Sequence, residues 1–316
     1  MHFLSLLSMI SLVSAAALIH PRQNSTGCTN PEKRVEFRTL DAVAQKQYTD
    51  AVMCLSTKPS TIGLNTTLYD DFTYIHTHLN ELIHYVAMFL PWHRYFVQLY
   101  HSHLGDCGYT GPMVYWDWTL DAADPAKSSI WAVVGGNGGE KTEKAGNQEF
   151  SCLTDGPFKG LRPAYFQTAY APHCLSRDFF DGIDRPGNMR GSAYSAEQIQ
   201  IISEKNNYSD YRLYLESIPH GSIHSAVGGE KGDMRPSSSP NEPLFFMHHT
   251  QIDRLWYLWQ QSNPELREKD IKDQKFNPDD GTIATLEDIM PFMGLAADIK
   301  ISEIMTTQND LLCYIY

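Results

Sequence analysis

Histidines that could bind a metal are concentrated in two stretches of this chain, far apart in the sequence. The first stretch supplies three candidate ligands and the second supplies three more: His76, His84 and His93, then His220, His224 and His249. Neutral imidazole nitrogen suits copper, zinc, iron and nickel, whereas calcium and magnesium prefer oxygen ligands. The count predicts two metal sites, each held by three histidines.

In the second stretch, helical spacing brings the candidate ligands to common faces. His220 and His224 are four residues apart and share a helical face, and Pro219 fits the first turn of that helix. His249 and Asp253 have the same spacing. Asp253 is therefore expected either to orient the His249 ring or to hold a neighbouring helix in place.

In the first stretch, the spacing predicts one shared helix and one break. His76 and His84 are eight residues apart, so on a single helix they would lie within about 80° of each other. His84 and His93 would lie on opposite faces of an unbroken helix. Pro91 between them predicts that the helix is interrupted, which would allow both rings to reach one site.

The other histidines are less favoured as metal ligands. His78 and His248 each stand beside a favoured ligand and compete with it for one position. A lone histidine is more often structural or exposed than a ligand, and this interpretation applies to five more: His2, His20, His101, His103 and His173.

Apolar residues recur at helical spacing in most of the segments around the histidines. This pattern, with Pro91 as a helix start, predicts helices over 35–55, 70–85, 91–100, 195–203, 208–218 and 243–261. A short apolar run covers 113–118. Residues 121–191 are rich in Gly, Pro, Ser and Asp and are expected to form a long covering loop. These segments predict a single, mainly helical domain.

Composition and targeting signals narrow the class of protein further. The chain has 316 residues and a net charge of −12 without a basic cluster, which argues against nucleic acid and anionic membranes as partners. Residues 1–17 resemble a secretory signal peptide, leaving a mature domain over 18–316 without a membrane anchor. Six cysteines follow, and in a secreted protein they predict three disulfides of undetermined pairing.

Two motifs carry a family resemblance. Residues 89–94 (Phe-Leu-Pro-Trp-His-Arg) and 242–254 (Glu-Pro-Leu-Phe-Phe-Met-His-His-Thr-Gln-Ile-Asp-Arg) resemble the two copper-binding signatures of the tyrosinase, catechol oxidase and hemocyanin superfamily. The chain is most similar to the short secreted fungal polyphenol oxidases, from about Cys28 to Tyr316. The resemblance implies a mainly α fold, in which a central antiparallel four-helix bundle holds a dinuclear copper site beneath long covering loops.

The resemblance also implies roles for individual residues. His76, His84 and His93 would bind the first of two copper ions, and His248 would be a neighbour of the second site rather than a ligand. The ligands of the second copper would be His220, His224 and His249. Framework positions of the family match Arg94, Asp253, Arg254 and the closing Tyr314-Ile315-Tyr316.

Three departures from the family pattern affect what is expected. Glu242-Pro243 replaces the usual Asp-Pro and keeps the charge. Many members join a cysteine to the second ligand of the first copper by a thioether, but no cysteine lies near His84, so none is expected here. The nearest upstream, Cys54, is better placed for a disulfide. The chain stops at the Tyr-x-Tyr motif, so we expect no shielding domain.

The residue after the first ligand of the second copper bears on substrate choice. Members that hydroxylate monophenols often have Asn there, paired with a Glu that holds a water able to deprotonate the phenol. This chain has Gly221, which lacks the amide. Glu216 is the candidate for holding a water, and its alternative is a solvated helix residue. We expect Gly221, Ser225, Val227 and Gly228 to leave room for a bulky phenol.

The resemblance therefore implies an enzyme that uses dioxygen to oxidise o-diphenols or o-aminophenols to o-quinones, with weak or no monophenol hydroxylation. One alternative is an oxidase dedicated to one phenolic intermediate of fungal secondary metabolism. A second is a hemocyanin-like oxygen carrier, although such carriers are large assemblies. A third is a zinc hydrolase, although the sequence has no His-Glu-x-x-His motif.

Overall fold

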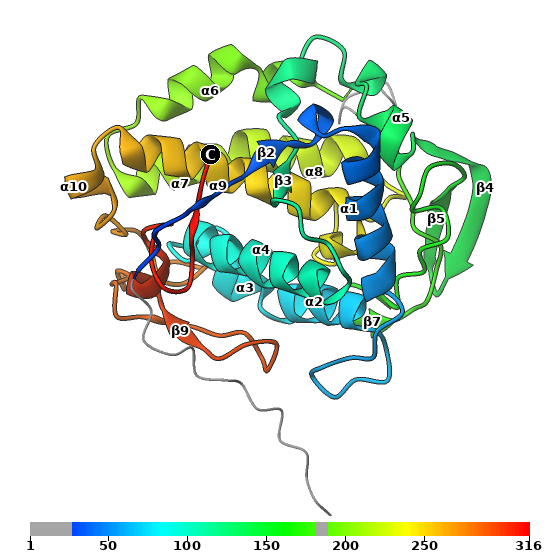
Figure 1. Cartoon of the computed structure of the whole chain (residues 1–316), viewed down its shortest axis with the longest axis horizontal. Helices are drawn as coiled ribbons and strands as arrows, with labels where there is room; N and C mark the ends of the chain where they lie inside the picture. Colours follow the sequence, from blue (N-terminus) through cyan, green and yellow to red (C-terminus); the bar gives the residue numbers. More distant parts are fainter. Residues whose placement is uncertain (1–26, 181–188) are drawn as a thin grey trace, which may run out of the picture.

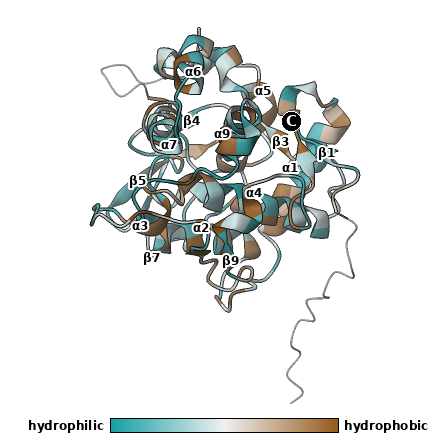
Figure 2. Ribbon diagram, turned by 90° about the vertical axis from the view of Figure 1, so that its left-hand side faces the viewer, coloured by the Kyte–Doolittle hydropathy of each residue, from teal (hydrophilic) through white to brown (hydrophobic). Residues whose placement is uncertain are grey.

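Two 18-residue helices, α4 (Phe89–Asp106) and α9 (Leu244–Gln261), pack against each other in the interior of the molecule (Figure 1). Their contact includes the rings of Tyr100 and Phe246, which stack with centroids 3.5 Å apart. Figure 2 shows hydrophobic segments of both helices lying between α6 at the top and β9 at the bottom. This helix pair carries one histidine of the first stretch and two of the second.

The computed structural model describes residues 27–180 and 189–316. The predicted signal peptide, His2 and His20 lie outside these ranges. The described part is mainly helical, as predicted, whereas the antiparallel four-helix bundle remains a prediction. Its other helices are α1 (Ala42–Leu55), α2 (Leu68–His78), α3 (Asn80–Ile83), α5 (Trp131–Val134), α6 (Ala196–Ser203), α7 (Tyr208–Leu215), α8 (Gly221–Gly228) and α10 (Pro264–Arg267).

Short strands pair around the helices. Two parallel pairs join distant segments, β1 (Glu32–Lys33) with β10 (Tyr314–Ile315) and β2 (Val35–Glu36) with β3 (Val114–Tyr115). The antiparallel pairs are β4 (Gly138–Ala145) with β5 (Gln148–Leu153), β6 (Tyr165–Phe166) with β7 (Ala169–Tyr170), and β8 (Ile289–Met290) with β9 (Ile299–Lys300). The β4–β5 hairpin lies in the segment expected to be a loop, where glycines and charges hide the strand pattern.

The helix predicted over 91–100 begins earlier and ends later, as α4 (Phe89–Asp106), and two others do not form one continuous helix. Residues 35–55 do not form one helix, because Val35 joins strand β2 and the side chain of Asp41 caps α1 by accepting the N–H of Ala44. Residues 70–85 are also divided, since α2 ends at His78 and the short α3 follows. The helices predicted over 195–203 and 243–261 are confirmed within one residue at each end.

The segment around Pro219 differs from the prediction in its geometry. Pro219 does not begin a helix; it lies inside a π-helical turn, η5 (Glu216–His220), which connects α7 to α8. The backbone therefore runs as one helical rod from Tyr208 to Gly228, with the proline accommodated where the regular hydrogen-bond ladder widens.

All six cysteines form disulfides, so the predicted number is confirmed and no cysteine is left for a thioether with His84. The pairs are Cys28–Cys313, Cys54–Cys107 and Cys152–Cys174. The first pair joins the two ends of the described chain beside the β1–β10 pairing. Within the described residues, no helix combines the length and apolar character needed to cross a membrane.

A buried carboxylate on α9 connects both ends of the described chain to the helix pair. Asp253 accepts hydrogen bonds from Arg94 at 2.5 Å, from Arg34 at 3.1 Å, and from the hydroxyls of Tyr314 and Tyr316 at 2.6 Å each. Burial raises the pKa of the Asp253 carboxyl, but the two guanidinium groups and the two hydroxyls hold it below its ordinary value. We call these five residues the Asp253 cluster.

Replacing Asp253 by Asn is expected to lower the free energy of unfolding by about 3–5 kcal/mol, because two buried guanidinium groups lose their counter-charge. Urea denaturation measures the change. Asp50→Asn is the control, since Asp50 is exposed and forms a surface ion pair with Lys46, and it should cost about 0.5 kcal/mol or less. Equal effects of the two substitutions would contradict the role given to the Asp253 cluster.

Candidate metal centre

The three histidines of the first stretch converge on one point. One ligand nitrogen from each of His76, His84 and His93 lies within 4.8 Å of the others. His76 is on α2, His93 is on α4, and His84 follows α3 in an extended conformation. The predicted break before Pro91 is thus present, but His76 and His84 do not share a helix as predicted, because α2 has already ended at His78.

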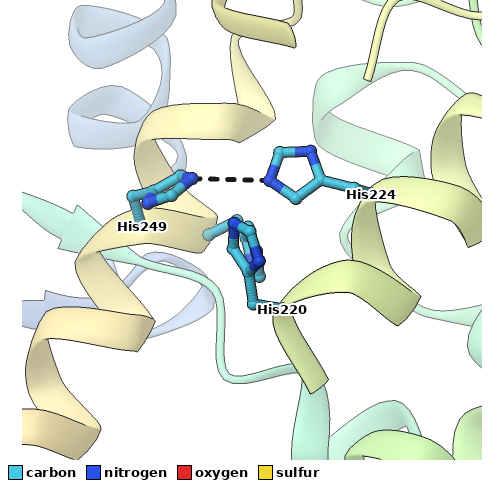
Figure 3. A group of neighbouring side chains, drawn as sticks. His220, His224 and His249 are labelled. Carbon is cyan, nitrogen blue, oxygen red and sulfur yellow. Dashed lines mark hydrogen bonds between the residues drawn. The ribbon is translucent and has the colours of Figure 1, made fainter. Parts of the chain in front are cut away.

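The second stretch brings four imidazoles together rather than three. Nitrogens of His220, His224, His248 and His249 all lie within 4.8 Å of one another. Figure 3 shows the rings of His220, His224 and His249 converging from different helical segments. His220 ends η5, His224 is on α8, and His248 and His249 are on α9.

The two clusters adjoin each other across the α4–α9 interface. The rings of His93 and His249 stack with centroids 4.3 Å apart, and those of His84 and His220 are 6.1 Å apart. Phe245 is fully buried and its ring contacts both clusters, at 5.1 Å from His76 and 4.1 Å from His249. The arrangement can therefore hold two cations side by side over an apolar base.

Backbone carbonyls determine which nitrogen of each ring faces the centre of its cluster. A carbonyl can only accept a hydrogen bond, so the ring nitrogen beside it carries the proton and the other nitrogen keeps its lone pair. Five rings present Nδ1 to a carbonyl in this way: His76 to Ser237 (2.7 Å), His84 to Asn80 (3.2 Å), His93 to Phe89 (2.7 Å), His220 to Glu216 (3.0 Å) and His224 to Met234 (2.5 Å).

The nitrogens that face inward lack protein partners. Nε2 of His76, His93 and His220 is buried without a hydrogen bond. Burial, together with neighbouring imidazoles, holds the pKa of these three rings well below its ordinary value, so they are neutral. Several buried lone pairs directed at one space are costly unless a cation accepts them. The residues present therefore fit a metal that prefers neutral imidazole.

His248 differs from the other rings in its protonation. The indole N–H of Trp118 donates to His248 Nδ1 at 3.1 Å, and an indole nitrogen cannot accept. The proton of the neutral ring must therefore lie on Nε2, which is buried without a hydrogen-bond partner. His248 has no lone pair to offer there, which agrees with its expected place beside the ligands.

His249 donates no hydrogen bond to Asp253, so of the two roles expected for that carboxylate the structure favours the one that ties helices together. His249 Nδ1 is buried without a partner, and its Nε2 lies 3.4 Å from Nε2 of His224. This close approach of two ring nitrogens, drawn as the dashed line in Figure 3, is what a shared cation would require.

A cavity of about 290 Å³ opens onto both clusters and is lined by His76, His84, His220 and His224. A second cavity of about 420 Å³ adjoins it, and Gly221 and Ser225 line both. Two of the expected pocket residues do not line either cavity: Val227 is fully buried, and Gly228 packs against the Arg235 backbone. A groove of about 470 Å³ between α6, α7 and α9 contains no histidine.

Glu216 is buried rather than solvated, so the alternative given to it was wrong. Its carboxylate accepts the N–H of Tyr85 at 2.7 Å and a guanidinium N–H of Arg212 at 3.0 Å. Burial raises the pKa of Glu216 to about 7, although Arg212 and the Tyr85 N–H act in the opposite direction. Glu216 is not among the residues that line the two cavities.

The remaining described histidines occupy structural or surface positions, as predicted for His101, His103 and His173. His78 is exposed, and its Nδ1 lies 2.7 Å from the carbonyl of Tyr74. The others have partners away from both clusters: His101 with Gly111, His103 with Asp106 and His173 with Asp233. Sequence reasoning missed Ser237 and Met234, whose backbone carbonyls orient ligand candidates. Every residue has a backbone carbonyl, so the residue type does not reveal which carbonyl has this role.

Comparison with known proteins agrees with this geometry. Residues 66–262 match the family model for the common central domain of tyrosinase. The chain is 38% identical to "Tyrosinase ustQ" of Aspergillus flavus, over 98% of this chain and 88% of that protein. It is 28% identical to "N-acetyl-6-hydroxytryptophan oxidase ivoB" of Emericella nidulans, over the full length of both.

Among solved structures, a point mutant of the polyphenol oxidase from Thermothelomyces thermophila matches with a TM-score of 0.75 and 25% identity. The match covers 90% of this chain and 88% of that one. The family model spans more than half of the chain and includes all seven clustered histidines. The chain therefore belongs to the tyrosinase family and is an oxidoreductase.

Proposed function

We propose that this protein is a dicopper oxidase that uses dioxygen to convert o-diphenols to o-quinones, or o-aminophenols to the corresponding o-quinone imines. The observation that carries the proposal is the pair of adjoining histidine clusters, in which Nε2 of His76, His93 and His220 is buried without a hydrogen-bond partner. Family membership implies a dinuclear copper centre, and neutral imidazole is a good copper ligand.

Six rings would hold the two ions. His76, His84 and His93 would hold the first, and His220, His224 and His249 the second, with His248 excluded by its proton on Nε2. Bound copper would supply the electron-transfer chemistry that couples a phenol to dioxygen. Two molecules of o-diphenol lose four electrons and four protons in total, which reduce one dioxygen to two waters.

The chain's own residues would orient the substrate and keep the site dry. The two cavities lead to the histidines from solvent, and Gly221 leaves the space beside His220 free of a side chain. The buried ring of Phe245 excludes water beneath both clusters. The backbone carbonyls that hold Nδ1 keep each ring in place.

Replacing a histidine by Asn distinguishes a metal ligand from a histidine that only lies beside the site. Asn retains a polar atom near the position of Nδ1 and has none at the position of Nε2. His93→Asn is expected to lose copper at one site, lowering the content from about two ions per chain to about one, with loss of oxygen uptake. His248→Asn keeps an acceptor for Trp118 and is expected to retain both ions. Metal analysis of purified protein measures both, and copper loss in His248→Asn would refute the tautomer argument.

We propose that Gly221 limits monophenol hydroxylation, because this position cannot help to hold a water that deprotonates the phenol. The backbone there is ordinary right-handed helix, and an added Cβ would meet only the Glu216 carbonyl at 3.5 Å. A side chain at this position is therefore tolerated.

Gly221→Asn is expected to raise the ratio of monophenol to diphenol oxidation at least about tenfold, which is below the roughly 100- to 10,000-fold that a positioned general base typically contributes. Gly221→Ala is the matched control, since it adds Cβ without the amide and should leave the ratio unchanged. Oxygen uptake on matched monophenol, catechol and o-aminophenol substrates gives the ratio. Rapid monophenol turnover without a lag in the unmodified protein would overturn the proposed limit.

For Glu216 we propose a positioning role instead of the expected water-holding one. His84 is the one ligand candidate that lies outside a helix, and Tyr85 after it has a left-handed backbone with φ of 58°. Glu216 accepts the Tyr85 N–H, and Gln274 donates to the Tyr85 carbonyl at 2.8 Å. These bonds would hold His84 where many family members use a thioether.

Glu216→Ala is expected to loosen His84 and lower copper content at the first site, whereas Glu216→Gln, which keeps an acceptor for the Tyr85 N–H, should retain more copper. Metal analysis and hydrogen exchange over residues 84–88 measure the two effects. If Glu216→Ala keeps two ions and unchanged exchange, the positioning role is wrong.

A second candidate is an oxidase dedicated to one elaborate phenol. The relative named as an N-acetyl-6-hydroxytryptophan oxidase, which is named for a single substrate, favours it. Three disulfides support secretion, since disulfides persist in oxidising compartments. Catalytic oxygen uptake with simple catechols would support the general oxidase, and uptake restricted to one elaborate phenol would support the dedicated one. Reversible oxygen binding without turnover would identify a carrier.

A further inference from the structure

The two cavities at the histidine clusters share one charged residue. Arg235 lines both, together with Tyr85, Gly221 and Ser225, and Arg190 lines the outer one. Among the described residues, no Asp or Glu lines either cavity. The described lining of the two cavities is therefore positively charged, in a chain whose net charge is −12. A neutral phenol would gain nothing from this local excess of positive charge.

Arg235 is held at a fixed place relative to both clusters. The carbonyl of the preceding residue, Met234, accepts from His224, and the carbonyl of Ser237 accepts from His76. Residues 234–237 thus supply one carbonyl that accepts a hydrogen bond from a histidine of each cluster, and Arg235 lies between these two carbonyls in the sequence. Its backbone cannot shift without disturbing the rings.

The guanidinium of Arg235 is available to a ligand. Arg235 is exposed, and its side chain donates to the carbonyl of Gly229 at 3.2 Å. No ion pair joins it to a carboxylate within 27–180 and 189–316. Serines also line the two cavities: Ser217, Ser222, Ser225, Ser237 and Ser239. Guanidinium and hydroxyl donors together form a surface suited to an oxyanion.

We propose that the preferred substrates are catechols or aminophenols that carry a carboxylate on a short side chain, and that Arg235 binds this carboxylate with Arg190 assisting. The proposal rests on the oxidase function proposed above and specifies the substrate class of the same site. Arg235 would determine specificity while the aromatic ring meets the histidines. Guanidinium pairs with carboxylate in a planar, two-pronged geometry, which gives orientation as well as affinity.

The test compares 3-(3,4-dihydroxyphenyl)propionate with its methyl ester, using the copper-loaded protein and oxygen uptake. The acid is expected to have a kcat/KM about fivefold above that of the ester at low salt, near the upper range for one exposed ion pair, and the advantage should shrink as salt is added. Arg235→Gln should abolish the advantage by raising KM for the acid alone. Arg162→Gln, at an exposed arginine that pairs with Glu143, is the control and should keep it.

Binding of analogues that cannot react gives a second readout. In calorimetry, 3-phenylpropionate should bind the unmodified protein more tightly than 3-phenylpropionamide, and Arg235→Gln should remove the difference. Equal kcat/KM values for the acid and the ester in the unmodified protein would refute the proposal and leave the oxidase function intact. An equal loss for both substrates in Arg235→Gln would show a merely structural role. Failure to oxidise either catechol would refute the oxidase function itself.

Discussion

Keeping several buried imidazoles neutral, with lone pairs directed at a common space, is the constraint on which this structure depends. Such an arrangement is unfavourable for a bare protein, because inward nitrogens such as Nε2 of His76, His93 and His220 lose their water without gaining a hydrogen-bond partner. The chain meets the constraint by giving the outer nitrogen of five rings a backbone carbonyl. Ring orientation and tautomer are thereby set before any metal arrives, which is the preorganisation that a metal site requires.

The carbonyls that accept these hydrogen bonds are of two kinds. Some belong to the same helical segment as the histidine, and others belong to a different segment of the chain and connect the two halves of the centre. His93 and His220 use carbonyls four residues earlier, as their own helical segments provide. His76 and His224 depend on Ser237 and Met234, which lie in an irregular segment before α9. That segment and the α4–α9 contact together hold the two clusters in a fixed position relative to each other.

Much of the site could be predicted from residue type and spacing, and the missing parts have physical causes. The six favoured histidines do come together, and the interruption before Pro91 exists. The shared helix of His76 and His84 was wrong because periodicity continues past the point where α2 ends. The burial of Glu216 and the tautomer of His248 depend on contacts with Tyr85 and Trp118, residues far away in sequence that no local pattern reveals.

The Asp253 cluster has a consequence for how the molecule is made. Its members come from the segment between β1 and β2, from α4 and α9, and from the Tyr-x-Tyr motif at 314–316. A ribosome releases these parts in order, so Asp253 lacks two of its four partners until Tyr314 and Tyr316 emerge. The helix that carries His248 and His249 therefore acquires this support only after the motif has left the ribosome.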